Sequence, residues 1–241
     1  LMREYLYLFI LIFSIFVSCD DGRIYEKEII IPQEGLTVKL KAQLTGAETW
    51  NDRYSLVLAG FTEGNEYATI SKVITSNIAS DGMVEVSMSG IKDNVDEVEL
   101  CMINRLRKRV VTFKQILKED FPSNSDTIFM DAGKVDASMF EAIQANAFNA
   151  SCVGCHGGNG NAVRGLFLTE GKSYEGLVGK ASKVNPDMLL VNPGKAQESF
   201  LPLILEEDGH VAHSHIDILD AKKKTALVTL IKDWINNGAK E

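Results

Sequence analysis

The chain of 241 residues has few histidines and few cysteines, four of each. No histidine precedes His156, and no catalytic group of residues stands out in that earlier part of the chain. A second C-x-x-C pair is also absent, so the pair at Cys152 and Cys155 lacks the partners that a four-cysteine zinc site needs. Positive charge is in deficit. The formal net charge is −8, which disfavours nucleic acid and an anionic membrane surface as partners.

Long hydrophobic runs are almost absent as well. The exception covers residues 5–17 and is too short to span a bilayer as a permanent helix. It has the length of a signal-peptide core. Ser18 and Cys19 follow, and a small residue directly before a cysteine resembles a bacterial lipobox, in which the cysteine is lipidated and becomes the first mature residue. We therefore expect a lipoprotein signal peptide over 1–18, a lipid on Cys19 and a tether over 19–27.

A lipid on Cys19 would supply a membrane anchor by burying acyl chains. This predicts a lipid-anchored protein in the cell envelope of a Gram-negative bacterium, in the outer membrane, on its periplasmic or its surface face. The acidic pair Asp20–Asp21 resembles export signals of some surface lipoproteins. The alternative is an ordinary signal peptide that is cut near Ser18 and leaves Cys19 as a free thiol.

The residues from about 28 to 132 read as short β-strands. In the clearest of them, residues 36–44, hydrophobic and polar residues alternate, which is typical of a strand with one buried face. Turn-forming residues separate the other strand candidates, which are 54–61, 68–75, 83–88, 95–103, 109–113 and 127–130. This spacing predicts an all-β, immunoglobulin-like sandwich. We expect it to serve as a docking or spacer module, or as a plain scaffold.

Near Gly133 the hydrophobic period changes to that of a helix. Hydrophobic residues recur at helical spacing just before the C-x-x-C pair, at Met139, Phe140, Ile143, Ala147 and Phe148. They do so again near the end of the chain, at Leu227, Leu230, Ile231, Trp234 and Ile235. Strands followed by helices predict two domains, a β-sandwich over 28–132 and an all-α domain over 133–241.

The run Cys152-Val153-Gly154-Cys155-His156 has the spacing of c-type haem attachment. Two thiols on one incipient helical turn can reach the two vinyl groups on one edge of a porphyrin, and His156 then lies under the iron as its proximal ligand. A redox dithiol and half of a zinc site are the alternatives. No βαβ pattern surrounds the pair, which disfavours the dithiol. Cys101 lies in a hydrophobic strand candidate, where a buried structural thiol is expected.

Residues from about 136 to 240 resemble a small monohaem cytochrome c domain of the kind appended to exported bacterial proteins. The matching pieces, in chain order, are 148–151, the C-x-x-C-H run, Gly157–Gly158, 165–168, 174–178, Asn192-Pro193-Gly194, 199–201 and 234–239. The resemblance implies an all-α cytochrome c-like fold with one covalent haem c. It also implies that the protein is an electron carrier or redox subunit rather than an enzyme.

One departure from that family concerns the second iron ligand. Such domains usually place a methionine before the last helix, whereas this chain has three of its four histidines there, at His210, His213 and His215. We expect bis-histidine ligation through His215 or His213, with His215 preferred because it lies nearer to Ile216 and Ile218. Solvated loop histidines, or Met188 as ligand, are the alternatives. A second imidazole donates more strongly than a thioether, which predicts a lower reduction potential.

The leading hypothesis is thus a membrane-anchored c-type cytochrome that exchanges electrons with a redox partner protein or an envelope complex. The alternative is a cell-envelope binding or assembly subunit in which the haem is structural and the β-sandwich makes the protein contacts. Catalysis at an open iron position is a third possibility, and it requires that none of the three clustered histidines binds the iron.

Overall fold

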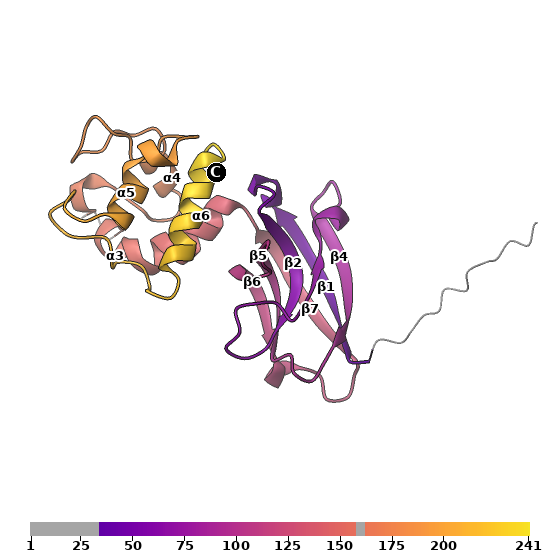
Figure 1. The fold of residues 1–241 in the computed structure, drawn as a ribbon. Coiled ribbons are helices and arrows are strands. Elements are labelled where there is room, and N and C mark those ends of the chain that lie inside the picture. The colour runs from indigo at the N-terminus through magenta and orange to yellow at the C-terminus, as the bar shows by residue number, and fades with distance from the viewer. Residues whose placement is uncertain (1–33, 158–161) are drawn as a thin grey trace, which may run out of the picture. The chain divides into compact units, whose positions relative to one another are not determined.

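The computed structural model describes residues 34–157 and 162–241, which belong to one compact unit (Figure 1). The predicted signal peptide over 1–18, the lipid on Cys19 and the tether over 19–27 lie outside the described residues. So does the start of the predicted β-sandwich. Within the described ranges, no helix is long and hydrophobic enough to cross a membrane.

Two β-sheets form the N-terminal part. One has the strand order β4–β1–β7 and the other the order β3–β2–β5–β6. β1 pairs with β7 in parallel and with β4 in antiparallel orientation, and all pairs of the second sheet are antiparallel. The strands are β1 (Leu36–Thr45), β2 (Tyr54–Phe61), β3 (Ile70–Val73), β4 (Met83–Ile91), β5 (Glu97–Asn104), β6 (Arg109–Leu117) and β7 (Thr127–Asp136).

The alternation in β1 gives it one buried and one exposed face. Val38, Leu40, Ala42 and Leu44 are buried, and the lysines between them are exposed. Burial of such side chains contributes about 1.5–3 kcal/mol each for the larger ones. In the other sheet β2 and β5 are buried on both faces, so they read as nearly continuous hydrophobic runs.

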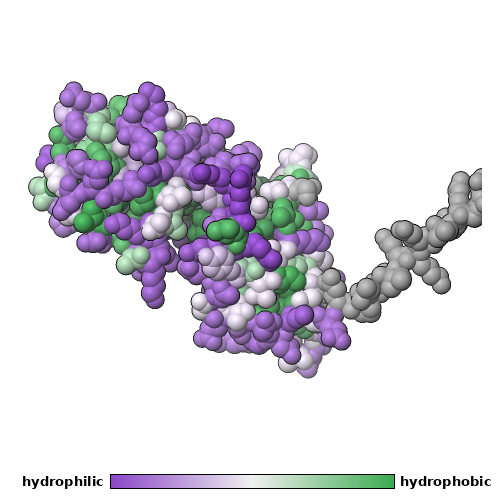
Figure 2. All heavy atoms as spheres, viewed as in Figure 1, coloured by the Kyte–Doolittle hydropathy of each residue, from purple (hydrophilic) through white to green (hydrophobic). Residues whose placement is uncertain are grey.

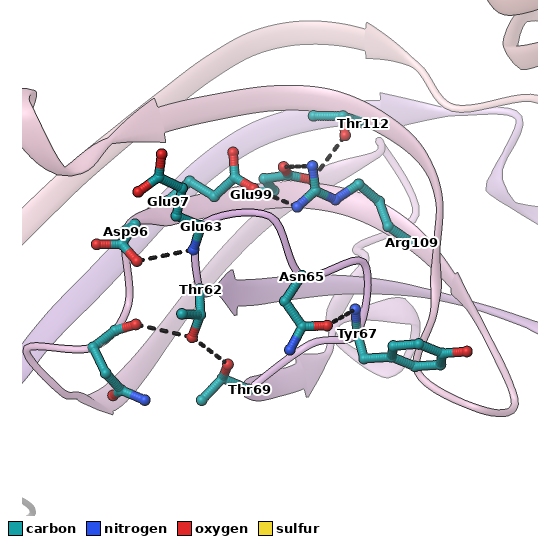
Figure 3. A network of polar contacts seen from close by, with 11 residues as sticks. Thr62, Glu63, Asn65, Tyr67, Thr69, Asp96, Glu97, Glu99, Arg109 and Thr112 are labelled. Atoms are coloured by element: carbon teal, nitrogen blue, oxygen red, sulfur yellow. Dashed lines mark hydrogen bonds and ion pairs between the residues drawn. The ribbon is translucent and has the colours of Figure 1, made fainter. Parts of the chain in front are cut away.

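The face of β5 that points away from the main hydrophobic core carries a buried carboxylate. Glu99 is fully buried beside Arg109, whose guanidinium Nη1 lies 3.0 Å from Glu99 Oε1 and whose Cζ lies 4.1 Å from the Phe61 ring centre. Thr112 donates a 2.7 Å hydrogen bond to Glu99 Oε2, as Figure 3 shows. Burial raises the pKa of Glu99, while Thr112 and Arg109 oppose the rise. Cys101, on the same face, is fully buried as predicted.

β7 continues past residue 132, where the sequence predicted the first domain to end, and reaches Asp136. The C-terminal part therefore begins after Asp136. Its α-helices are α2 (Met139–Ile143), α3 (Val153–His156), α4 (Ser173–Leu177), α5 (Phe200–Glu206) and α6 (Lys224–Asn236), and a π-helix over Gln144–Cys152 joins α2 to α3. Turns, short 3-10 segments and isolated β-bridges connect these helices. On the face in Figure 2, scattered hydrophobic atoms interrupt its mostly hydrophilic surface.

The predicted fold class, a β-sandwich followed by an all-α cytochrome c-like domain, is wrong. The structure has two β-sheets of seven strands in total and only short helices, and its C-terminal part is not an all-α cytochrome-like domain. The helical periods around 139–148 and 227–235 do form helices, but the residues between them are rich in turn formers. There the chain makes bridges such as Val178 to Val191 and Ala181 to Leu189.

Hydrogen bonds join the C-terminal part to the sheets. Trp50 donates its indole Nε1–H to the Ala137 carbonyl at 2.6 Å. Asp233, buried on α6, accepts a 2.7 Å hydrogen bond from the Tyr54 hydroxyl and forms a 2.7 Å ion pair with Arg53. The side chains of both parts belong to one continuous hydrophobic core. The position of α6 therefore depends on the end of the four-stranded sheet.

We expect Asp233→Ala to lower the free energy of unfolding by about 1–3 kcal/mol, because it leaves the Tyr54 hydroxyl without its acceptor. The Arg53 ion pair adds little, since 59% of the Arg53 side chain is exposed. Urea denaturation measures the change. Asp187→Ala, at an exposed site, is the matched control. Equal stability of the two variants would contradict the structural role of Asp233.

Burial, and then the hydrogen bond to Asp233, raise the pKa of the Tyr54 phenol. A phenol whose pKa is higher in the folded state stabilises the fold fully below its unfolded pKa of about 10, and this contribution is lost as pH rises above that value. Unfolding free energies measured from pH 8 to 11 should therefore fall more steeply for the natural chain than for Tyr54→Phe. Parallel curves would show that Tyr54 titrates alike in both states.

Candidate functional site

A π-helix positions the first cysteine of the C-x-x-C-H run. Ser138 caps the start of α2 by accepting a hydrogen bond from the Glu141 backbone N–H at 3.2 Å. The helix then widens into π turns over Gln144–Cys152. This conformation is rare in proteins overall, but where it occurs it is often at a functional site. The Cys152 thiol lies 3.6 Å from the Ala147 carbonyl, five residues back. Cys152 is partly buried, whereas Cys155 is exposed.

A buried amide braces this helix against the segment that follows the motif. Gln144 is 1% exposed and donates its amide to Asn149 Oδ1 at 2.7 Å and to the Leu168 carbonyl at 2.9 Å. The Ser173 hydroxyl donates to Gln144 Oε1. Buried polar groups are stable when all their partners are present, and such networks specify one arrangement. Gln144 thus ties the helix before Cys152 to the start of α4.

His156 is partly buried, with its Nδ1–H placed to donate to the Leu166 carbonyl at 3.2 Å. That bond selects the tautomer in which Nε2 carries a free lone pair. Metal-binding histidines commonly have this arrangement, in which a backbone carbonyl orients the ring. Burial, and then the nearby His215, lower the pKa of His156, and the bond to Leu166 opposes them. A neutral imidazole with a free Nε2 is the form that binds a metal.

His215 repeats this arrangement from the other side. Its Nδ1 lies 2.7 Å from the His213 carbonyl, so the His213 backbone orients the ring and leaves Nε2 free. The ring centroids of His156 and His215 are 6.5 Å apart. With bonds from imidazole nitrogen to metal of about 2 Å and a ring nitrogen about 1 Å from its ring centre, two rings on opposite sides of one ion have centroids about 6 Å apart. The observed separation therefore fits one metal ion held between the two imidazoles.

The other candidate ligands are placed differently. The His213 ring packs edge-on against His215, with centroids 5.8 Å apart, and its carbonyl serves His215. His210 lies 3.2 Å from the Glu207 carboxylate. Neither His210 nor Met188 is among the residues that line the cavities around His156. Of the sequence candidates, the structure brings His215 together with His156 and leaves His213 beside the pair.

A hydrophobic cavity of about 290 Å³ lies beside both imidazoles and both cysteines of the motif. No aspartate, glutamate, lysine or arginine is among its lining residues. The walls come mainly from leucine and isoleucine, among them Leu166 after the motif, Leu205 on α5 and Ile231 on α6. A second cavity of about 570 Å³ adjoins it, because His156 and His215 line both. Predominantly hydrophobic cavities of such sizes are typical of sites for organic ligands and cofactors.

The two thiols are poorly suited to a redox dithiol. Burial, and then the neighbouring Cys155, raise the pKa of Cys152 to about 11. Reactive dithiols need a lowered pKa, because the thiolate is the nucleophile. Zinc takes three or four protein ligands, and over residues 34–157 and 162–241 no group of three or more ligand side chains is placed to hold a metal ion. A haem brings four nitrogen ligands itself and needs only the two imidazoles, so this donor set fits it.

Sequence reasoning missed the partners of the two rings. The carbonyls of Leu166 and His213 are backbone groups, so residue types do not reveal them. Gln144 could have been noticed as a polar residue within a hydrophobic helical stripe. No spacing pattern in the sequence predicts the three basic residues that line the larger cavity, which are Lys180, Lys183 and Arg164.

In the reduced chain without haem, we expect iodoacetamide at pH 8 to modify Cys155 well before Cys152. Cys155 is exposed, while Cys152 is partly buried and has a raised pKa, which keeps it a thiol. Peptide mass mapping over time measures both rates. Alkylation of Cys152 first, or at the same rate, would contradict the burial described here.

Comparison of the chain with protein families, with curated proteins and with solved structures found no match. The function is therefore argued from the geometry around His156 and His215.

Proposed function

We propose that the chain binds one haem c covalently and acts as a membrane-anchored electron-transfer protein. Cys152 and Cys155 would each add their S–H across a vinyl group, forming a C–S bond and passing the proton to the other vinyl carbon. His156 and His215 would hold the haem iron through their imidazole Nε2 atoms. The observation that carries the proposal is the pair of imidazoles 6.5 Å apart, each oriented by a backbone carbonyl, beside the two cysteines.

The residues of the site favour electron transfer over catalysis. Haem supplies an iron that changes its oxidation state by one electron. With both His156 and His215 bound to the iron, the haem would exchange electrons and would not bind a substrate. α5 and α6 contribute hydrophobic walls to the cavity beside the imidazoles. Ligation by two imidazoles favours a lower potential than ligation by histidine and methionine.

The remaining parts of the proposal concern location and partners. A lipid on Cys19 would anchor the protein in the envelope of a Gram-negative bacterium, in the outer membrane. Its partner would be a redox protein or an envelope complex rather than nucleic acid, in line with the net charge of −8.

A second candidate is an envelope binding or assembly subunit in which the haem is structural. One observation favours it. α6 lines the cavity through Ile231 and also holds the end of the four-stranded sheet through Asp233. Filling the cavity would therefore stabilise the contact with the sheets. Reversible reduction by an electron donor in the intact protein distinguishes the carrier from this alternative.

The proposal is tested by visible spectra of the purified protein, oxidised and reduced, with a pyridine haemochrome assay. We expect c-type bands and haem that remains attached after denaturation. His215→Ala should change the oxidised spectrum toward a high-spin form, because one strong axial ligand is lost. His210→Ala, at a histidine that lines neither cavity, should leave the ligation unchanged and is the matched control. His213→Ala tests the other candidate ligand and should keep the low-spin spectrum.

Three outcomes would contradict the proposal at different points. Absence of c-type bands in protein from cells that mature cytochromes c would end the haem assignment. A methionine–iron charge-transfer band would overturn ligation by two histidines. A spectrum altered by His213→Ala and unaltered by His215→Ala would exchange the roles of these residues.

A further inference from the structure

The two adjoining cavities differ in charge, and this difference gives the site a direction. Both cysteines of the motif line the smaller cavity and not the larger one. Lys180, Lys183 and Arg164 line the larger cavity and not the smaller one, and no carboxylate is among its lining residues. Three histidines, His156, His213 and His215, line both. The chain therefore places the histidines between two thiols on one side and three cations on the other.

Haem has the same order of chemical groups. Its two vinyl groups lie on one edge, the iron at the centre and the two propionate carboxylates on the opposite edge. Building on the proposed function, we propose that Lys180, Lys183 and Arg164 form the subsite for the haem propionates. With the vinyl edge at Cys152 and Cys155 and the iron between the imidazoles, the carboxylates extend into the cationic cavity.

The cations stand in a chain that carries more acidic than basic residues, 33 against 25. Three cations among the lining residues of one cavity that has no lining carboxylate therefore stand out from the average surface. Lys183 donates a 2.6 Å hydrogen bond to the Arg164 carbonyl, which holds these two residues together. A lysine has three N–H donors, so Lys183 retains two for a carboxylate.

The segment that carries the two lysines is held in place by its own backbone. Leu190 donates its N–H to the Lys180 carbonyl at 2.6 Å, and bridges join Val178 to Val191 and Ala181 to Leu189. Buried Ser182, between the lysines, accepts hydrogen bonds from two following backbone N–H groups, those of Val184 and Asn185. Cations on a braced segment lose less conformational freedom on binding.

The test uses a ligand that lacks the charge. The full chain with Cys152→Ala and Cys155→Ala would be titrated with haemin and with haemin dimethyl ester, whose propionates are uncharged. We expect Lys180→Ala combined with Lys183→Ala to weaken haemin binding about fivefold to tenfold, since exposed ion pairs contribute up to about fivefold each. Binding of the dimethyl ester should not change. Lys222→Ala, exposed and outside both cavities, is the matched control.

A second measurement uses the covalent protein. Cations beside the propionates favour the reduced haem, which carries one positive charge fewer. The midpoint potential of the double lysine variant should therefore fall relative to the natural chain, and that of Lys222→Ala should not.

The outcomes separate the two levels of the argument. Two results for the double lysine variant would overturn the propionate subsite. One is an equal loss of affinity for haemin and for its dimethyl ester; the other is an unchanged affinity for haemin together with an unchanged midpoint potential. In either case a bis-histidine spectrum with haemin would leave the proposed function standing. Failure of haemin to bind the cysteine-free chain, together with absence of covalent haem in the natural chain, would remove the proposed function and the subsite with it.

Discussion

The proposed haem site depends on one constraint: the imidazoles of His156 and His215 must lie close enough to bind one metal ion between them, and their centroids are 6.5 Å apart. His156 meets it because the π-helix and Gln144 bring the C-x-x-C-H run beside the Leu166 carbonyl, which orients its ring. His215 meets it because the His213 carbonyl, two residues back, holds its ring in the matching tautomer. The two carbonyls orient the imidazoles, as the hydrogen-bond partners of ligating histidines do in metal sites.

The scaffold explains how two histidines far apart in the sequence keep this separation. α5 and α6 both supply hydrophobic walls of the cavity, and α6 is fixed to the sheets by Asp233 and by the shared core. The irregular segment between α4 and α5 is tied by backbone bridges rather than by helix formation. A short-helix architecture can therefore be rigid where the site needs it.

The strands and the motif could be predicted from the sequence, whereas the C-terminal architecture could not. The period of two in β1 identifies its bounds to within a residue, because one face is buried. The helical periods at 139–148 and 227–235 mark true helices, but they led to an all-α prediction. The turn-forming residues between them pair through isolated bridges, whose partners lie too far apart in sequence for a local pattern to reveal. Tertiary contacts decide that region.

The same limit applies to the site. Residue types and spacing single out Cys152, Cys155 and His156, and clustering singles out the three later histidines. Only the fold distinguishes His215, whose ring centroid lies 6.5 Å from that of His156, from His213, whose carbonyl orients the His215 ring. The three basic residues of the larger cavity, Arg164, Lys180 and Lys183, belong to no sequence motif. They line one cavity only because the fold brings two separate segments of the chain together.

The central claim is that one iron is held by His156 and His215. Low-temperature electron paramagnetic resonance of the oxidised, purified protein tests it most directly. The account predicts a low-spin ferric signal typical of two imidazole ligands, converted to a high-spin signal in His215→Ala. A high-spin signal in the natural protein, or a low-spin signal that persists in His215→Ala, would contradict it.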